Sequence, residues 1–202
     1  MKLSYRILAV LVLSGAAAGV LAGCATAKKG KSDEREIVKL TPFFVANPKD
    51  SEFLRSHLKK FGLAPLVEDR RDFIERYRFL WARSFHPAAC FEVEYRADGT
   101  GTYRAMVSRE EGGVSRCIVE KTHRVDRKHL DFYRYMIASY KMFDLPWYDD
   151  RSGYDGSSWL IEMVRGDQHH ELYRWSPEDG PVRTFGNCLI EEAIDSVFIP
   201  IY

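Results

Sequence analysis

The chain has 202 residues, of which 46% are hydrophobic and 29% are charged, enough for one domain with a sizeable core. Its 30 basic and 29 acidic residues nearly cancel, leaving a formal net charge of +1. Because nucleic-acid-binding domains carry a clear excess of basic residues, this balance argues against that class, and we expect no nucleic-acid partner.

The first 23 residues have the pattern of a targeting segment. Lys2 and Arg6 provide a positive start, and residues 7–21 are apolar or small and carry no charge. A membrane-spanning helix needs about 20 strongly apolar residues, so this run is short and too rich in Ala and Gly for one. An ordinary cleaved signal peptide and an uncleaved signal anchor are the two alternatives to the interpretation that follows.

The apolar run ends in Leu-Ala-Gly-Cys at residues 21–24, which resembles the lipobox of bacterial lipoproteins. The resemblance implies cleavage before Cys24, a diacylglycerol on its thiol and an acylated amino group. Two or three such chains anchor a protein far better than one, since each buried CH₂ contributes about 0.8 kcal/mol. Ala25 rather than Asp follows, which in enteric lipoproteins implies export to the outer membrane, facing the periplasm. The membrane is therefore the first expected partner.

The expected organisation has three parts. Residues 1–23 are a lipoprotein signal peptide, and residues 24–38 are the lipidated Cys and a tether of small and charged residues without apolar periodicity. Residues 39–202 form a single domain. Loss of Lys2 and Arg6 with the signal leaves 28 basic and 29 acidic residues in the mature chain.

The first elements of this domain are a helix and a strand. Apolar spacing predicts a helix over residues 47–62, capped by Asp50 or Ser51 and ended by Gly62. Residues 68–75 fit a second short helix, and strict alternation then predicts a strand over residues 77–85 with the aromatic rings of Tyr77, Phe79 and Trp81 on one side.

Further alternation predicts an antiparallel meander of three strands over residues 90–125, with turns at Asp98-Gly99 and at 111–113. A helix follows, capped by Asp126 and ended by Pro146. A hairpin then turns at Gly166-Asp167, and a last helix covers residues 187–197. Runs of adjacent strands favour an α+β fold: an antiparallel sheet of about five to six strands with helices packed on one face.

Three cysteines follow Cys24, and an exported protein can keep disulfides. Three thiols allow at most one internal pair. Cys90 and Cys117 lie on the two outer strands of the meander, separated by about twice the 4.8 Å strand spacing, which is beyond disulfide reach. Cys188 can meet either one if its helix packs on the sheet, so the pairing stays open.

Two sequence patterns resemble metal-binding motifs but match none of them. His170-Glu171 begins a zinc-protease pattern, but the second His is missing, and on a strand His169 and His170 point to opposite faces. His169 and Glu171 would then face solvent. A loop that lacks the EF-hand spacing gathers Asp149, Asp150, Ser152 and Asp155, so a solvated turn is expected there. We expect no metal and no cofactor.

A hairpin turning at Gly166 places Glu162 opposite Glu171, and paired carboxylates are able to do acid–base chemistry. They would also repel each other unless an arginine such as Arg104, Arg165 or Arg174 neutralises them. No nucleophile-elbow or phosphate-binding motif occurs, so no residue is expected to be catalytic.

The most distinctive stretch of the chain is residues 174–183, which begins with Arg-Trp-Ser-Pro, and Asp-Gly-Ser-Ser-Trp precedes it at residues 155–159. Together with residues 78–87 and 98–101, they resemble a group of uncharacterised bacterial proteins that carry DGxxW and RWSP segments. The resemblance covers about residues 75–195, implies no activity, and marks Trp159, Arg174 and Trp175 as candidate binding residues.

Three functions fit these expectations. The first is a non-catalytic binding or adaptor module of the cell envelope that recognises an envelope protein or a ligand, with exposed aromatic rings at Trp147, Tyr148, Trp159 or Trp175. The second is a protective, immunity-type inhibitor that offers its acidic loop to a basic site. The third is a small periplasmic hydrolase, which requires a cleft where Glu162, Glu171 or a His converge.

Overall fold

The computed structural model of the protein describes residues 48–69, 73–112 and 114–193. The predicted signal peptide, the lipid attachment at Cys24 and the tether lie outside these residues, as does the predicted end of the last helix.

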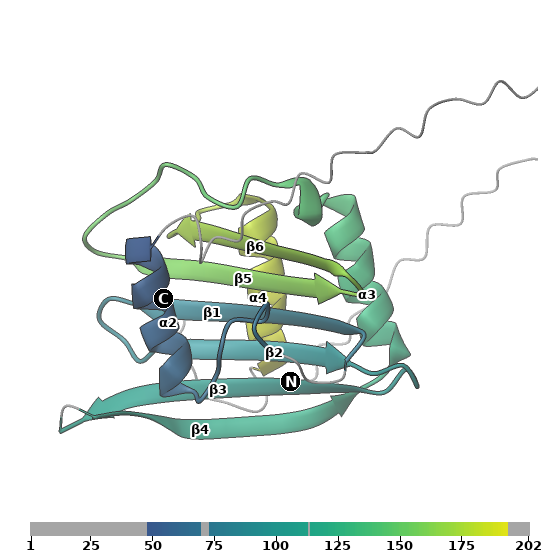
Figure 1. Cartoon of the computed structure of the whole chain (residues 1–202), viewed down its shortest axis with the longest axis horizontal. Helices are drawn as coiled ribbons and strands as arrows, with labels where there is room; N and C mark the ends of the chain where they lie inside the picture. Colours follow the sequence, from purple (N-terminus) through teal and green to yellow (C-terminus); the bar gives the residue numbers. More distant parts are fainter. Residues whose placement is uncertain (1–47, 70–72, 113, 194–202) are drawn as a thin grey trace, which may run out of the picture. The chain divides into compact units, whose positions relative to one another are not determined.

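The described chain builds one six-stranded antiparallel sheet with the order β4-β3-β2-β1-β5-β6 (Figure 1). The meander β2-β3-β4 and the hairpin β5-β6 are confirmed, and β1 joins them by pairing with both β2 and β5. The fold class of the sequence prediction is therefore confirmed. The strands are β1 (Glu75–Arg83), β2 (Ala89–Tyr95), β3 (Gly101–Glu111), β4 (Val114–Val125), β5 (Ser157–Arg165) and β6 (Gln168–Trp175).

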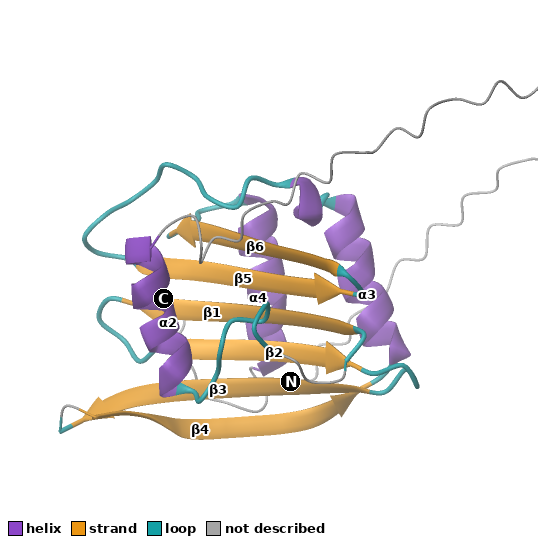
Figure 2. Ribbon diagram, in the orientation of Figure 1, coloured by secondary structure: helices purple, strands orange, loops and turns teal. Residues whose placement is uncertain are grey.

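In the described part of the chain, the sheet is accompanied by three α-helices and a short 3-10 helix: α2 (Pro48–Lys60), α3 (Arg127–Ser139), η1 (Met142–Asp144) and α4 (Gly180–Ala193). Two of them, α3 and α4, share one face as expected, whereas α2 covers the other face (Figure 2). The expectation of helices on one face is corrected for α2. The physical reason is that Leu80, Cys90 and Leu160 form an apolar row on the sheet face opposite α3 and α4, and this row needs a cover of its own.

Several helix boundaries differ from the predicted ones. Helix α2 begins at Pro48, a residue suited to the first helical position, so the predicted cap positions 50 and 51 lie inside the helix. For α3 the cap is confirmed, because the Asp126 side chain accepts hydrogen bonds from the backbone N–H groups of Lys128 and His129.

The last two helices also start or stop elsewhere. Helix α3 ends at Ser139, before Pro146, because Lys141 adopts a left-handed backbone conformation (φ 49°) ahead of η1. Helix α4 begins at Gly180, seven residues before the predicted start. Gly180 adopts φ +84° and Pro181 follows in the first turn, a start signal that the spacing of apolar residues does not reveal.

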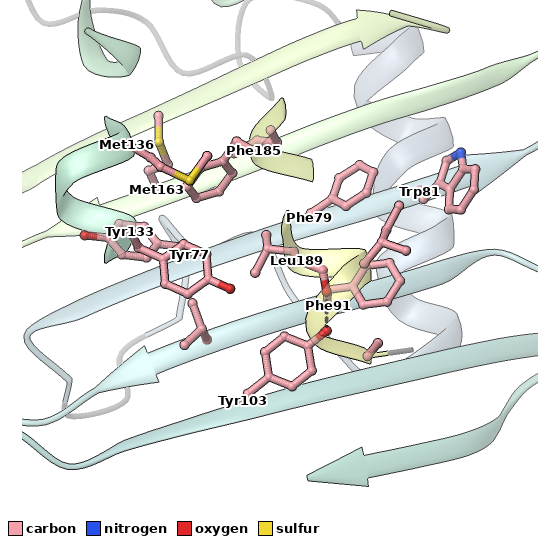
Figure 3. Packing of buried hydrophobic residues seen from close by; sticks show 14 of the residues in the cluster. Tyr77, Phe79, Trp81, Phe91, Tyr103, Tyr133, Met136, Met163, Phe185 and Leu189 are labelled. Carbon is pink, nitrogen blue, oxygen red and sulfur yellow. Dashed lines mark hydrogen bonds between the residues drawn. The ribbon is translucent and has the colours of Figure 1, made fainter. Parts of the chain in front are cut away.

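The face under α3 and α4 holds a closely packed aromatic core (Figure 3). The ring centroid of Phe79 lies 4.6 Å from that of Trp159, and Tyr77 meets Phe185 edge-on at 6.1 Å. The Tyr103 hydroxyl donates a hydrogen bond to the carbonyl of Leu189, which ties α4 to β3. Burial of these large rings contributes about 1.5–3 kcal/mol each.

All three described cysteines are free thiols. Cys90 and Cys117 lie on the α2 face, whereas Cys188 packs against the core on the opposite face. The sheet therefore separates Cys188 from both possible partners. Burial raises the pKa of the Cys90 thiol, which keeps it protonated and unreactive.

Candidate functional site: a cleft beside helix α2

Strand register divides the α2 face of the sheet into successive rows that cross the strands. The middle row is apolar and lies under α2: Met106, Cys90, Leu80, Leu160 and Tyr173 occupy facing positions on β3, β2, β1, β5 and β6. Neighbouring rows lie two residues along each strand, about 6.6–6.8 Å away. One neighbouring row is charged and buried, and the other opens into a cleft.

We call the charged row the charge ladder. Its members face each other from β3 to β6 in the order Arg104, Glu92, Arg78, Glu162 and Glu171. Arg78 lies at its centre with a fully buried side chain, 2.8 Å from a Glu92 oxygen and 2.9 Å from a Glu162 oxygen. The predicted opposition of Glu162 and Glu171 is confirmed, but Arg78 rather than the expected arginines neutralises Glu162.

The segment between α2 and β1 closes the charge ladder. The Leu66 N–H donates to Glu162 over 2.6 Å, and the Ala64 carbonyl accepts from Arg78 over 2.7 Å. Burial raises the pKa of Glu162, and nearby Glu171 raises it further. Neither carboxylate lines the cleft described below. A substrate therefore has no open approach to this pair there, and the ladder is a structural element.

A cleft of 810 Å³ lies on the other side of the apolar row, where β1, β3 and β6 end. Helix α2, the β1–β2 turn and the loop before β5 form its walls. Its floor includes Ser158 and Tyr173, whose hydroxyl oxygens lie 3.1 Å apart in a shared hydrogen bond. The Tyr173 ring stacks on Tyr148 at a centroid distance of 5.6 Å, so the floor is held in place from behind.

Exposed aromatic rings stand around this cleft. Phe53 on α2 is 47% exposed, Phe85 in the β1–β2 turn 75% and Tyr154 in the loop before β5 100%. Large apolar side chains gathered on a surface mark a binding site more often than scattered ones do. Sequence analysis did not assign these three to a binding site, although an aromatic residue inside a turn or a Gly-containing loop is a signal that could have found Phe85 and Tyr154.

The titratable side chains of the cleft are mostly basic. Among the residues that the structure describes, Lys60, Arg83 and Arg109 line it, against one acidic residue, Glu110. Two histidines complete the set, and burial lowers the pKa of His57, which therefore lines the cleft as a neutral ring near pH 7.

The two distinctive sequence segments meet at Trp175, one wall of the cleft. The Ser157 N–H donates to the Ser176 hydroxyl and the Ser176 N–H to the Ser157 carbonyl, both over 2.8 Å. A Cβ at Gly153 would lie 2.6 Å from the Trp175 indole nitrogen, and one at Gly156 would lie 2.4 Å from the Ser176 oxygen. The loop therefore needs glycine at these positions to pack against the Trp175 ring.

The three predicted binding residues point to three different places. Trp175 lines the cleft and is half-buried. Trp159 is 3% exposed and packs in the core on the opposite face, so it is not a surface binding residue. Arg174 donates to the carbonyls of Tyr173 and Pro146 and pairs with Asp149 at 3.5 Å, which makes it a positioning residue of the loop.

The remaining histidine pattern is also structural. His170 is buried, lies 2.8 Å from the Leu145 carbonyl and has its pKa lowered by burial. Glu171 is 2% exposed and lies on the α2 face of the sheet, which corrects the expectation that it faces solvent. His169 lies 3.3 Å from it. Among the residues that the structure describes, no three His, Cys, Asp or Glu side chains are grouped to hold a metal ion.

No protein-family model and no curated protein matches the chain. The resemblances to bacterial lipoproteins and to the DGxxW and RWSP group therefore stay predictions from the sequence. Within the described residues, no helix is long and apolar enough to cross a membrane.

Proposed function

We propose that the protein is a lipid-anchored lipoprotein of the cell envelope whose folded part is a non-catalytic binding module. Acyl chains on Cys24 hold it at the outer membrane, on the periplasmic side, and the cleft beside α2 receives the ligand. The lipobox at residues 21–24 supports the anchor. The observation that carries the binding function is the 810 Å³ cleft with Phe85 and Tyr154 exposed at its rim.

The contacts in the cleft favour binding over catalysis. A catalytic serine needs a general base within hydrogen-bond reach, and Ser158 instead shares its hydrogen bond with the Tyr173 hydroxyl. The carboxylate pair Glu162 and Glu171, the best acid–base candidate in the sequence, lies beyond the apolar row under its own cover. The acidic loop supports an inhibitor function less well, because Asp149 pairs with Arg174 within the molecule.

The anchor is tested by labelling cells with a radioactive fatty acid and separating their membranes by density. The native chain is expected to carry the label and to travel with the outer membrane, whereas Cys24→Ala loses both. Cys117→Ala is the matched control, because it removes a half-buried thiol that the lipobox does not involve. A native chain without label, or an unchanged membrane position of Cys24→Ala, would contradict the anchor.

The binding site is tested with a photo-crosslinking amino acid placed at single positions of the full-length protein in its own envelope. We expect a discrete adduct from position 85 or 154, both at the cleft. Position 135 is the control, since Tyr135 is 70% exposed but lies on α3, which covers the opposite face. The same adducts from all three positions, or none from the cleft positions, would argue against a binding function of the cleft.

A further inference from the structure

We infer that the cleft beside α2 binds an anionic saccharide, a glycan that carries carboxylate or phosphate groups. This inference rests on the proposed function, because it names the ligand class of the same cleft. Three properties of the cleft carry it: its charge, its mixture of hydroxyl and aromatic groups, and the fixed positions of two of its side chains.

The charge of the cleft differs from that of the whole chain. Of the described lining residues, Lys60, Arg83 and Arg109 against Glu110 leave a formal excess of two positive charges, with the histidines not counted. The complete sequence, by contrast, has 30 basic and 29 acidic residues. A cleft lined by one sign of charge focuses the field and raises the local concentration of ligands of the opposite sign. The bound ligand is therefore expected to be an anion.

The groups between these charges suit a sugar. Five serines line the cleft, and the hydroxyl pair of Ser158 and Tyr173 lies at its floor. Aromatic rings stand at its rim, Phe85 and Tyr154 among them. A pyranose ring packs its C–H face on an aromatic ring and directs its hydroxyl groups to hydrogen-bonding partners. An acidic peptide has no comparable set of hydroxyl groups to pair with the serines of the cleft, and the test below uses one as a competing probe.

Two of the binding groups are already held in place. The Arg83 side chain is 9% exposed, donates two hydrogen bonds to the Pro87 carbonyl at 2.9 and 2.6 Å, and lies over the Trp81 ring at 4.6 Å. Trp175 is packed against the backbone of Gly153 and Gly156. A ligand that meets fixed side chains loses less conformational entropy on binding, so both residues favour recognition.

The test measures binding of four probes to the full-length protein in detergent by titration calorimetry. The probes are oligogalacturonate, a phosphorylated mannan oligomer, neutral maltohexaose and a hexaglutamate peptide. We expect at least one of the two anionic glycans to bind about tenfold or more tightly than maltohexaose and hexaglutamate, with affinity that falls as salt rises. The preferred glycan then distinguishes a carboxylate from a phosphate source.

Two cleft variants connect this binding to the structure. Lys60→Gln removes a charge and Phe85→Ala removes a ring, and each is expected to weaken the anionic glycan about two- to tenfold. Lys121→Gln on β4 and Tyr135→Ala on α3 are matched controls, because both residues are exposed and neither lines the cleft. Equal losses in the controls would contradict the site.

The possible failures are distinguishable. Equal binding of hexaglutamate overturns the saccharide inference, and equal binding of maltohexaose overturns the requirement for charge. If none of the four probes binds while position 85 still gives a crosslinked adduct, the inference fails and the binding module stands. If no probe binds and no adduct forms, both the inference and the proposed function fail.

Discussion

The two faces of the sheet are built on different principles. The face under α3 and α4 is an aromatic and aliphatic core from β3 to β6, with ring contacts such as Phe79 on Trp159 and Tyr77 on Phe185. The α2 face is apolar only in its middle row and is charged on one side of that row and open on the other. The difference indicates that one face maintains the fold, which leaves the other able to hold polar groups and a ligand.

The α2 face keeps these polar groups apart by strand register. Residues two positions apart on β1 belong to three rows: Arg78 to the charge ladder, Leu80 to the apolar row and Ala82 to the cleft. The apolar row under α2 therefore separates the buried carboxylates from the cleft. Substitutions on each face are expected to have distinct effects, which the following predictions use in order of expected size.

The largest effect is expected from Arg78→Met, which leaves the buried carboxylates of Glu92 and Glu162 without their central cation. Loss of one partner of a buried ion pair lowers the free energy of unfolding by about 3–5 kcal/mol. Arg96→Met is the matched control, because the Arg96 side chain is 61% exposed and is expected to contribute about 0–1 kcal/mol. Urea unfolding measures the free energy of unfolding of both variants. Equal losses would show that the buried charge ladder stabilises the fold no more than an exposed ion pair does.

A smaller effect is expected on the other face from Gly186→Ala in α4. The added Cβ would lie 2.5 Å from the Trp159 ring and 3.2 Å from Phe79. Overpacking of a dense core costs about 1–3 kcal/mol, so the melting temperature should fall. Thr184→Ala on the same helix is the control, because Thr184 is only half-buried and lies outside the aromatic core, and it should stay within about 0.5 kcal/mol. A stable Gly186→Ala protein would mean that this core has room and is not closely packed.

The charge ladder also predicts a pH dependence of stability. Because burial and Glu171 raise the pKa of Glu162 above its ordinary 4.5, the folded state binds this proton more tightly than the unfolded chain does. The resulting stability is present below pH 4.5 and is lost as the pH rises through the folded pKa.

Removal of the neighbouring charge in Glu171→Gln lowers the folded pKa of Glu162, so the variant should lose less stability than the native protein as the pH rises from 4.5. Urea unfolding at a series of pH values measures the two slopes. Glu120→Gln is the control, because its side chain is 51% exposed. A slope identical to that of the native protein would show that Glu162 and Glu171 do not interact.

The smallest effect on stability is expected at the cleft. Phe85 is 75% exposed, so Phe85→Ser should change the free energy of unfolding by no more than about 0.5 kcal/mol. The same substitution should weaken binding at the cleft. A loss of more than about 2 kcal/mol in urea unfolding would place Phe85 in the packing of the fold and not at a separate binding surface.

Much of the fold could be predicted because its signals are local. Alternation identified the strand with Tyr77, Phe79 and Trp81, the turn chemistry of Gly166-Asp167 set the register of the hairpin, and Asp126 marked the start of α3. The face covered by α2 could not be predicted in this way. It depends on β1 lying between β2 and β5, and the pairing of β1 with β5 joins residues that are distant in sequence.

The candidate site shows the same limit. Trp175 was identified from its unusual segment and does line the cleft, whereas Trp159 has an equally distinctive segment and lies in the core. The two tryptophans lie on neighbouring strands, and each enters a different face because of the pleat. Segment patterns therefore indicated residues that matter but not the side of the sheet on which they act.

The sequence by itself determined the helices and strands and the pairing of strands adjacent in sequence, since helix and strand propensity, alternation and turn residues act within a few positions. It alone carries the predicted anchor at Cys24. Only the tertiary structure decided that Arg78 meets Glu162 from 84 residues away, and that α2, a turn and a loop close around one cleft. These contacts depend on how distant strands align and on what covers each face, and both are settled when the whole chain buries its apolar surface.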